Sequence, residues 1–509
     1  MSRARLPVLV GAAQLLDREL DPARSAAPLD MLTEVARTAA DRAGGGDDLL
    51  RALDSIALVE ILGWRPANGP RLLGERLGCE KLGAEYVCPT GGETPVALIN
   101  LMAERIYRGQ SEIALVAGCN NVKTLRAAHK AGFRPDWEKG GSGKPTQIGP
   151  TRPGSSDEEI RYGLALPPEI YPIFENALRV ARGLDLEQHR KGMGELMSSF
   201  TRVAAQNPDA WFPVERTATE LVTVSERNRM VAFPYPKYLN AFLDTDQAAA
   251  VLLMSQAKAR ALKIPQDKWV YWRGGASQNE AQWFASQRPD FAKCPAIRAC
   301  HNAALERAGV ELSQIDAFDF YSCFPVAVSM ACEMLGIPED DPRDFTVTGG
   351  LPYAGGPASA YSLHALAAMM DRIVEGKVET GLVTGNGWYL TKHAAVVLAA
   401  SPGEASSEPR FGDVWDESSP EAKQPEVMIA QVANGNATVE TYTMVFDREG
   451  RPQRGIVIGR LDDGRRFLAN TPDDLALNEQ IVAHELIGRR GRVWHDEDMN
   501  RFDPSPDYS

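Results

Sequence analysis

The sequence predicts an α/β fold: a duplicated core with layered αβαβα architecture, an inserted loop domain and a small C-terminal β domain. Segments from the first half of the 509-residue chain recur in the second half. An insertion of roughly 120 residues interrupts only the first copy. Near the C-terminus the hydrophobic pattern changes to period two, which is typical of β-strands.

The duplication is visible in matched helix ends and strands. Thr38–Gly44 recurs as Ala303–Gly309, and each segment is typical of a helix end closed by a glycine. Six positions between Ile106 and Gly118 match positions between Ile373 and Gly385 at one constant offset. These matches divide the chain into an N-terminal half at 1–265, with its loop domain at about 120–236, and a C-terminal half at 266–402.

Within each copy, apolar runs alternate with helical segments. The run 113–117 is continuously apolar, as expected for a strand covered on both faces. Segments 93–108 and 358–375 are rich in Ala, Leu and Met, which predicts helices buried between layers. The alanine-rich runs 248–252 and 394–398 also match each other. The pattern therefore predicts two α/β units packed together.

The insertion has a different character. Residues 120–156 combine Gly-Pro punctuation with seven basic residues, and 185–206 has the periodicity of an amphipathic helix. We expect the insertion to cover the mouth of the site.

A linker and a β domain follow the duplicated core. Residues 403–425 are rich in Ser, Glu, Pro and Gly, which is typical of a linker. Thr438–Phe446 alternates apolar and polar residues, and turn signals at 447–450 and 462–464 indicate hairpins. Residues 426–509 are therefore expected to form a small β-barrel, similar to an OB fold.

Composition excludes several classes of function. The net charge of −13 gives no basic footprint for nucleic acid or an anionic membrane surface, and no apolar run suits a membrane span. Seven scattered cysteines without a CxxC pair predict reduced thiols in a cytoplasm. Leu6–Leu16 is interpreted as a first buried strand, because no signal-peptide cleavage site follows it. The spacing of histidines and glycines predicts neither a metal nor a dinucleotide site.

The duplicated core, the run Asp246–Ala250 and the pair Gly349-Gly350 before a Gly-Pro turn resemble the thiolase superfamily. The pattern is most similar to the sterol-carrier-protein-thiolase-like branch, and within it to thiolase-like type 1 proteins with an extra C-terminal domain. The resemblance implies an acetyl-CoA acetyltransferase-like protein of lipid metabolism in the cytoplasm. It also implies coenzyme A as a substrate or cosubstrate, with no covalently bound cofactor.

Thiolases need a thiolate at a buried helix N-terminus, a second acid/base and an oxyanion hole. The resemblance places Gly92 at the attacking cysteine, Gly356 at the oxyanion-hole histidine and Gly385 at the second cysteine. Tyr321 stands where an asparagine would hold a catalytic water. All four motifs lack their reactive residue, so the resemblance does not carry over thiolysis through an acyl-cysteine.

Cys88 has two interpretations. With Thr90 and Gly91 it imitates a Cys-x-Ser-Gly motif, but four residues upstream of the expected position. It is either a displaced nucleophile or a buried structural thiol, which is the common role of free cysteines.

Polar residues remain at the other motif positions. Tyr321 and Cys323 form a Tyr-x-Cys-Phe element similar to that of thiolase-like aldolases, which implies an acid/base role for the tyrosine. Asn386 offers an amide donor, and the imidazole of His393 is suited to general-base catalysis near neutral pH. The structural alternative for Tyr321 is a packed aromatic ring with a satisfied hydroxyl.

The basic residues of the insertion are candidates for binding CoA phosphates. Arg126, Lys130 and Arg134 are the members that we assign to this role. The alternative interpretation is a solvated basic surface.

The leading hypothesis is a thiolase-like protein that cleaves or forms a carbon–carbon bond in acyl-CoA thioesters, by a retro-Claisen or retro-aldol reaction. Tyr321 or His393 would act as the base, and Asn386 or backbone N–H groups would hold the enolate oxygen. The alternative is a catalytically silent homologue that binds CoA or acyl-CoA, or a partner subunit. A third hypothesis is an ordinary acyltransferase that uses Cys88. We expect a monomer rather than the dimer that thiolases generally form.

Overall fold

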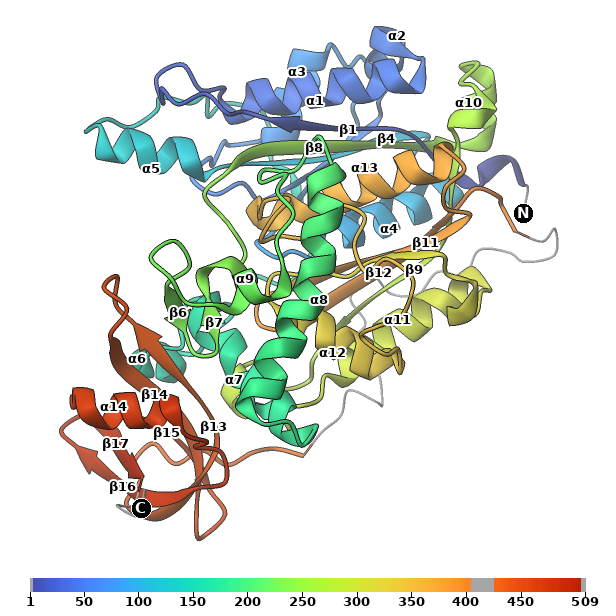
Figure 1. Cartoon of the computed structure of the whole chain (residues 1–509). Helices are drawn as coiled ribbons and strands as arrows, with labels where there is room; N and C mark the ends of the chain where they lie inside the picture. The colour runs from blue at the N-terminus through green and yellow to red at the C-terminus, as the bar shows by residue number, and fades with distance from the viewer. Residues whose placement is uncertain (1–2, 404–424, 505–509) are drawn as a thin grey trace.

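The structure, a computed structural model, describes residues 3–403 and 425–504 (Figure 1). The strands of both halves join in one ten-stranded sheet, in the order β10-β11-β12-β9-β1-β8-β4-β2-β3-β5. The elements of the N-terminal half are β1 (Pro7–Leu16), α1 (Pro28–Ala43), α2 (Gly46–Arg51), β2 (Ser55–Val59), α3 (Gly69–Leu77), β3 (Ala84–Cys88), α4 (Thr94–Tyr107), β4 (Ile113–Asn121), β8 (Asp246–Ser255) and α10 (Gln256–Ala261). Those of the C-terminal half are β9 (Val270–Asn279), α11 (Pro295–Ala308), β10 (Ala317–Asp319), α12 (Pro325–Leu335), α13 (Tyr361–Val374), β11 (Thr380–Gly387) and β12 (Lys392–Ala399).

The elements are stacked in five layers. Figure 1 shows α1 to α3 above β1, β4 and β8, the helices α4 and α13 in the middle, and β9, β11 and β12 below them. Helices α11 and α12 cover the outer face of the lower strands. Helix α4 contacts strands of both halves, because its sequence is apolar on nearly every side. The predicted αβαβα architecture is therefore confirmed.

The two halves repeat the same local structure. Helix α1 ends at Gly44 and α11 ends at Gly309, and both glycines adopt the left-handed conformation, with φ of 82° and 65°. Strand β4 runs parallel to β2 and antiparallel to β8; β11 runs parallel to β10 and antiparallel to β12. The sequence duplication is thus a structural duplication.

The insertion connects β4 to β8. It contains α5 (Val122–Lys130), β5 (Thr146–Gln147), α6 (Asp157–Tyr162), α7 (Pro167–Ala181), α8 (Leu186–Gln206), α9 (Ala218–Val222), β6 (Met230–Ala232) and β7 (Tyr235–Pro236). Helix α8 lies where the amphipathic pattern predicted a helix. Strand β5 pairs in parallel with β3 and so covers what would otherwise be the outer strand of the sheet.

The C-terminal region is a closed five-stranded barrel. Its elements are β13 (Gly435–Phe446), β14 (Pro452–Leu461), β15 (Arg466–Asn470), α14 (Leu475–Ala483), β16 (Arg490–Asp496) and β17 (Met499–Pro504). The order β14-β15-β17-β16-β13 closes because β13 also pairs with β14. This architecture confirms the predicted β-barrel. The predicted linker, 403–425, falls almost entirely outside the described residues.

Arg466 attaches the barrel to the C-terminal half. Its buried guanidinium donates to the carbonyl oxygen of Ser286 at 2.8 Å, and it lies 4.6 Å from the ring centroid of Phe291. Its Nε is 2.6 Å from a carboxylate oxygen of Glu440 on β13. No helix among the described residues combines the length and apolar character needed to cross a bilayer.

Candidate active site

The site is built around the N-terminal tip of α4. Helix α4 starts after Gly91-Gly92-Glu93, and the Thr94 hydroxyl donates to the carbonyl oxygen of Gly91 at 2.7 Å. The start of α13 holds this tip, because the Ser362 hydroxyl donates to the carbonyl oxygen of Gly92 at 2.8 Å. The tip is therefore a rigid, buried feature between the two halves.

Gly92 leaves no space for a nucleophile in this conformation. A Cβ atom at Gly92 would lie 2.3 Å from ring atoms of Tyr321. Tyr321 follows β10, and its backbone N–H donates to the hydroxyl oxygen of Thr384 at 3.0 Å. Tyr321 is partly buried, and its ring lies against the tip of α4. The position at which the resemblance predicts the attacking sulfur is thus filled by an aromatic ring.

The position of the second cysteine is also filled. A Cβ atom at Gly385 would lie 2.6 Å from the Cα of Glu93, and one at Gly387 would collide with the Glu93 carboxylate. The Glu93 carboxylate is 2.7 Å from Nζ of Lys392, and both side chains are fully buried. Lys392 also donates to the carbonyl oxygen of Thr90 at 2.9 Å. A buried carboxylate–ammonium pair therefore occupies the space beside the vacated sulfur position.

Tyr321, Cys323 and Asn386 are brought together by a residue of the insertion, Tyr171 on α7. Asn386 donates to the Tyr171 hydroxyl at 2.9 Å, and that hydroxyl donates to the carbonyl oxygen of Trp388, also at 2.9 Å. Burial raises the pKa of Cys323 to about 12, although a hydrogen bond with Tyr171 opposes the shift. Burial, followed by the electrostatic influence of Cys323 and Glu93, raises the pKa of Tyr321 well above 10. Tyr321 is consequently a protonated phenol at neutral pH.

His393 lies in a separate buried cluster. It is on β12, one residue after Lys392, so alternation along the strand turns the two side chains to opposite faces. Its Nε2 is 3.4 Å from Sγ of Cys294 at the start of α11. Burial, with a further contribution from His301, lowers the pKa of His393 to about 3, so the imidazole is neutral at physiological pH.

Cys88 is at the end of β3, not at the tip of α4. Its buried thiol donates to the carbonyl oxygen of Ile148 at 3.2 Å. Burial, reinforced by the charge of Glu93, raises its pKa. A thiol in this environment stays protonated and has little nucleophilic character.

The turn between β11 and β12 is strained next to the site. Trp388 and Leu390 both have φ of 55°, a conformation that side-chain-bearing residues rarely adopt. Ala358, which follows the Gly355-Gly356-Pro357 turn, also has a positive φ of 48°. Strain of this kind persists where surrounding structure enforces it, often at functional sites. Here the strained residues follow the motif positions Gly356 and Gly385 in sequence.

Gly356 stands at the place of the oxyanion-hole histidine. Its backbone N–H donates to the carbonyl oxygen of Phe242 at 2.8 Å, so this amide is already used. A Cβ atom at Gly356 would lie 3.2 Å from the same oxygen, a much milder approach than at Gly92.

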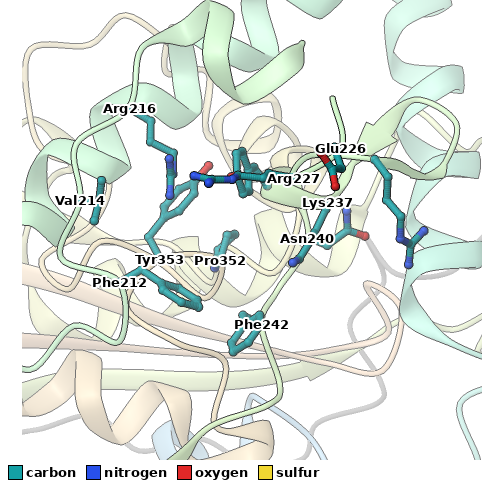
Figure 2. A pocket seen from close by; sticks show the side chains of 12 residues that line it. Phe212, Val214, Arg216, Glu226, Arg227, Lys237, Asn240, Phe242, Pro352 and Tyr353 are labelled. Carbon is teal, nitrogen blue, oxygen red and sulfur yellow. The ribbon is translucent and has the colours of Figure 1, made fainter. Parts of the chain in front are cut away.

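Phe242 also lines a cavity of about 370 Å³ between the insertion and the core. Figure 2 shows Arg216 and Arg227 extending toward Tyr353, with Phe212 and Phe242 below them. Besides these residues, the lining includes the charged side chains of Glu226, Arg229 and Lys237. Four basic residues against one acidic residue make the cavity electropositive, although the whole chain is acidic. The cavity could therefore receive an anionic ligand.

The three basic residues selected from the sequence lie outside this cavity lining. Arg126 and Lys130 are on α5, and Arg134 follows that helix; Figure 1 shows α5 at the far left of the core. Arg126 is exposed and pairs with Asp244 at 3.4 Å. Among the described residues, no three His, Cys, Asp or Glu side chains are grouped as metal ligands.

Comparisons with known proteins agree with this architecture. Residues 421–498 match the family described as thiolase-like protein type 1 additional C-terminal domain. A monomeric SCP2-thiolase like protein type 1 from Mycobacterium smegmatis is 32% identical, with a TM-score of 0.83, over 99% of this chain and 100% of that chain. The chain belongs to the SCP2-thiolase-like protein type 1 family.

Two further relatives match a smaller share of this type 1 protein. A probable acetyl-CoA acetyltransferase from Escherichia coli (strain K12) is 32% identical over 145 residues, which is 28% of this chain and 34% of the relative. The alignment thus spans about a third of that curated relative. An Ltp2-ChsH2(DUF35) aldolase shares the fold, with a TM-score of 0.59 and 16% identity over 79% of this chain and 100% of that chain.

Sequence reasoning missed Glu93, Lys392, Tyr171 and the basic lining of the cavity. One signal was present for Lys392: the match of 248–252 to 394–398 aligns it with Asp246, a second charge at the start of an apolar strand. Charges at such positions are unusual and point to a buried partner. For Tyr171, 150 residues away from the Tyr-x-Cys-Phe element, no local signal existed.

Proposed function

We propose that this protein acts on acyl-CoA thioesters and cleaves or forms a carbon–carbon bond by an aldol-type reaction, without a cysteine nucleophile. The observation that carries this proposal is that other groups occupy both positions at which the resemblance predicts a catalytic sulfur. Tyr321 fills the space at Gly92, the backbone of Gly92 and Glu93 fills the space at Gly385, and the Glu93–Lys392 pair lies next to it, against Gly387. The site has lost thiolase chemistry but keeps proton-transfer groups.

A retro-aldol cleavage suits these groups better than a retro-Claisen cleavage. Cleavage of a 3-oxoacyl-CoA needs a nucleophile that accepts the acyl group, and that is the role of the missing cysteine. Cleavage of a 3-hydroxyacyl-CoA gives an acyl-CoA and an aldehyde or ketone, and it needs only a base and a donor to the thioester oxygen. Tyr321, which burial keeps protonated, is the proposed donor.

The electropositive cavity is the proposed site of the CoA phosphates. The segment Ala241-Phe242 joins the cavity to two motif positions. The carbonyl oxygen of Phe242 accepts a hydrogen bond from the backbone N–H of Gly356, and the Ala241 N–H donates to the carbonyl oxygen of Cys323 at 2.9 Å. A nucleotide bound by Arg216 and Arg227 would thus direct its pantetheine arm toward the tip of α4. Arginine suits phosphate because its planar guanidinium offers several donors.

A panel of 3-hydroxyacyl-CoA and 3-oxoacyl-CoA esters, with products identified by mass spectrometry, tests the reaction. We expect cleavage of hydroxy esters and loss of roughly 100-fold or more in kcat for Tyr321→Phe. His393→Gln is the control and should retain activity if it folds, because His393 faces Cys294. Turnover of 3-oxo esters alone, or an unaffected Tyr321→Phe variant, would contradict the proposal.

The second candidate is a catalytically silent protein that binds CoA esters. The observation that favours it is the absence of free space at Gly92 and Gly385. Calorimetry with CoA and acyl-CoA separates the two: binding without turnover of any ester supports the silent protein, and no binding contradicts both.

We also infer a monomer. Thiolases generally pair through an edge of the core sheet, and here the insertion places β5 on β3 at that edge. Light scattering coupled to gel filtration should give a mass near 55.5 kDa. A mass twice as large would contradict this inference.

A further inference from the structure

The Glu93–Lys392 pair differs from an ordinary structural ion pair in its surroundings. Among the described residues, neither Glu93 carboxylate oxygen accepts a hydrogen bond from another residue apart from its contact with the Lys392 ammonium. A fully buried carboxylate with so few partners is costly, since burial removes the water that would otherwise solvate it. The buried Glu93 carboxylate is therefore expected to have a role other than stabilising the fold.

The chain contains a matched pair for comparison. Lys123 and Asp246 also form an ion pair, with Nζ 2.9 Å from the carboxylate; Asp246 is fully buried and Lys123 is partly buried. There the Thr124 backbone N–H and hydroxyl donate to Asp246, at 3.2 and 2.6 Å, and Lys123 donates to two carbonyl oxygens. Every group of the Lys123–Asp246 pair is thus satisfied, as expected of a structural contact.

Glu93 also lies beside Gly385, the position to which the family resemblance assigns the second cysteine, the additional acid/base of thiolases. A Cβ atom at Gly385 would lie 2.6 Å from the Cα of Glu93. The carboxylate lies against Gly91 and Gly387, and a Cβ atom at either position would collide with it. Burial raises the pKa of Glu93, and the Lys392 ammonium opposes that shift. Tyr321, Cys88 and Lys392 are the titratable groups around it.

We propose that Glu93, held in place by Lys392, is the general base of this site and takes over the role of the missing second cysteine. In cleavage, Glu93 removes the proton of the C3 hydroxyl. The C2–C3 bond breaks, a C3 carbonyl forms, and the electron pair moves into the thioester as an enolate. The protonated Glu93 then returns the proton to C2, which yields the shorter acyl-CoA and restores the carboxylate.

This inference rests on the proposed binding of acyl-CoA, but it can be tested without a cleavage substrate. A base that returns a proton to C2 should also exchange the C2 protons of a product such as acetyl-CoA or butyryl-CoA in D₂O. Mass spectrometry measures the deuterium incorporated. We expect exchange with the wild-type protein, and a loss of roughly 100-fold or more in Glu93→Gln.

The double variant Glu93→Gln/Lys392→Met separates catalysis from structure. It removes both charges, so its thermal stability should recover relative to Lys392→Met alone, as for other buried pairs replaced together. The proposal expects it to bind acyl-CoA in calorimetry but to stay without exchange. Lys123→Met/Asp246→Asn is the matched control and should keep exchange within about twofold of wild type if folded.

The outcomes distinguish this inference from the proposed function. Exchange by wild type and not by Glu93→Gln, without cleavage of any ester, supports the base and overturns the aldol reaction. Cleavage that survives in the double variant overturns the base and leaves the aldol reaction standing. Binding of acyl-CoA with neither exchange nor cleavage in the wild-type protein overturns both.

Discussion

The two halves of the core begin their last strand with a buried charge at equivalent positions, Asp246 in β8 and Lys392 in β12. In the N-terminal half, the chain leaves β4 through the long insertion, and Asp246 is surrounded by donors from the first turn of α5. In the C-terminal half, only the strained turn 388–391 separates β11 from β12, and Lys392 reaches across to Glu93. The charged residue at this position therefore holds neighbouring segments together in the N-terminal half. In the C-terminal half, we propose that it positions a catalytic base.

The halves also differ in their buried histidines. We expect the largest effect from this difference, which should make the C-terminal half more sensitive to acid. Burial lowers the pKa of His301 to about 4 and those of His364 and His393 to about 3, and all three lie in the C-terminal half. In the N-terminal half, residues 1–121 contain no histidine, and the buried His189 of the insertion lies 2.8 Å from the carboxylate of Glu175. When the pH falls below about 6.5, the histidines of the unfolded chain bind protons, whereas the buried histidines of the folded chain stay neutral. The free energy of unfolding is therefore highest above about pH 6.5 and decreases toward pH 3.

Between about pH 6.5 and the pKa in the folded chain, each histidine should lower the free energy of unfolding by about 1.4 kcal/mol per pH unit. We expect hydrogen exchange to accelerate first in the C-terminal half when the pH is lowered from 6.5 to about 4. His301→Leu should reduce the pH slope of the free energy of unfolding by the contribution of one histidine. Asp319, whose pKa burial raises to about 6, acts in the opposite direction and is unchanged in this variant. An equal acid response of both halves would contradict the comparison.

Removing one lysine from each pair tests the contrast directly. Lys392→Met leaves the Glu93 carboxylate buried with no replacement donor, so we expect a loss of about 3–5 kcal/mol in the free energy of unfolding. Lys123→Met leaves Asp246 with both Thr124 donors, and the expected loss is about 1–2 kcal/mol. Urea denaturation of both variants at pH 7 measures the difference. Equal losses would show that the two pairs are equally structural.

The next prediction compares the stability of alanine variants at two motif glycines, Gly92 in the N-terminal half and Gly356 in the C-terminal half. Gly92→Ala places a methyl group 2.3 Å from the ring of Tyr321, whereas Gly356→Ala approaches the Phe242 carbonyl oxygen at 3.2 Å. We expect Gly92→Ala to cost about 1–3 kcal/mol by overpacking and Gly356→Ala to cost less. Denaturation curves measure both, and Gly92→Ala/Tyr321→Ala should recover part of the loss. No recovery in the double variant would mean that Tyr321 does not fill the nucleophile position.

Much of the fold could be predicted from the sequence because its signals are local and repeated. The helix ends at Gly44 and Gly309, the apolar strand at 113–117 and the alternating strand at 438–446 each show their structure within a few residues. The duplication then fixed the layers, since both copies had to bury the same faces. The closed barrel followed from period-two segments separated by turn residues.

The site was less predictable because its partners come from distant segments. Gly92 lies just before the start of α4, and its proximity to Tyr321 depends on how the two halves pack. Tyr321 was expected as a base, but burial and a neighbouring carboxylate favour its protonated form, and neither is visible in a motif. His393 follows Lys392 in sequence, and strand alternation assigns the two residues to different faces.

The insertion, which the C-terminal half lacks, offers the smallest and most specific test. Its first part carries Arg126 on the exposed surface of α5, and its second part carries Arg227 in the electropositive cavity. If the cavity receives the CoA phosphates, Arg227→Ala should weaken CoA binding about tenfold, the equivalent of one charged contact. Arg126→Ala should change affinity by less than about twofold, since an exposed charge is screened by solvent and salt. Calorimetry at two salt concentrations measures both variants, and a greater loss of affinity with a shallower salt dependence for Arg126→Ala than for Arg227→Ala would place the phosphates on α5, as the sequence had suggested.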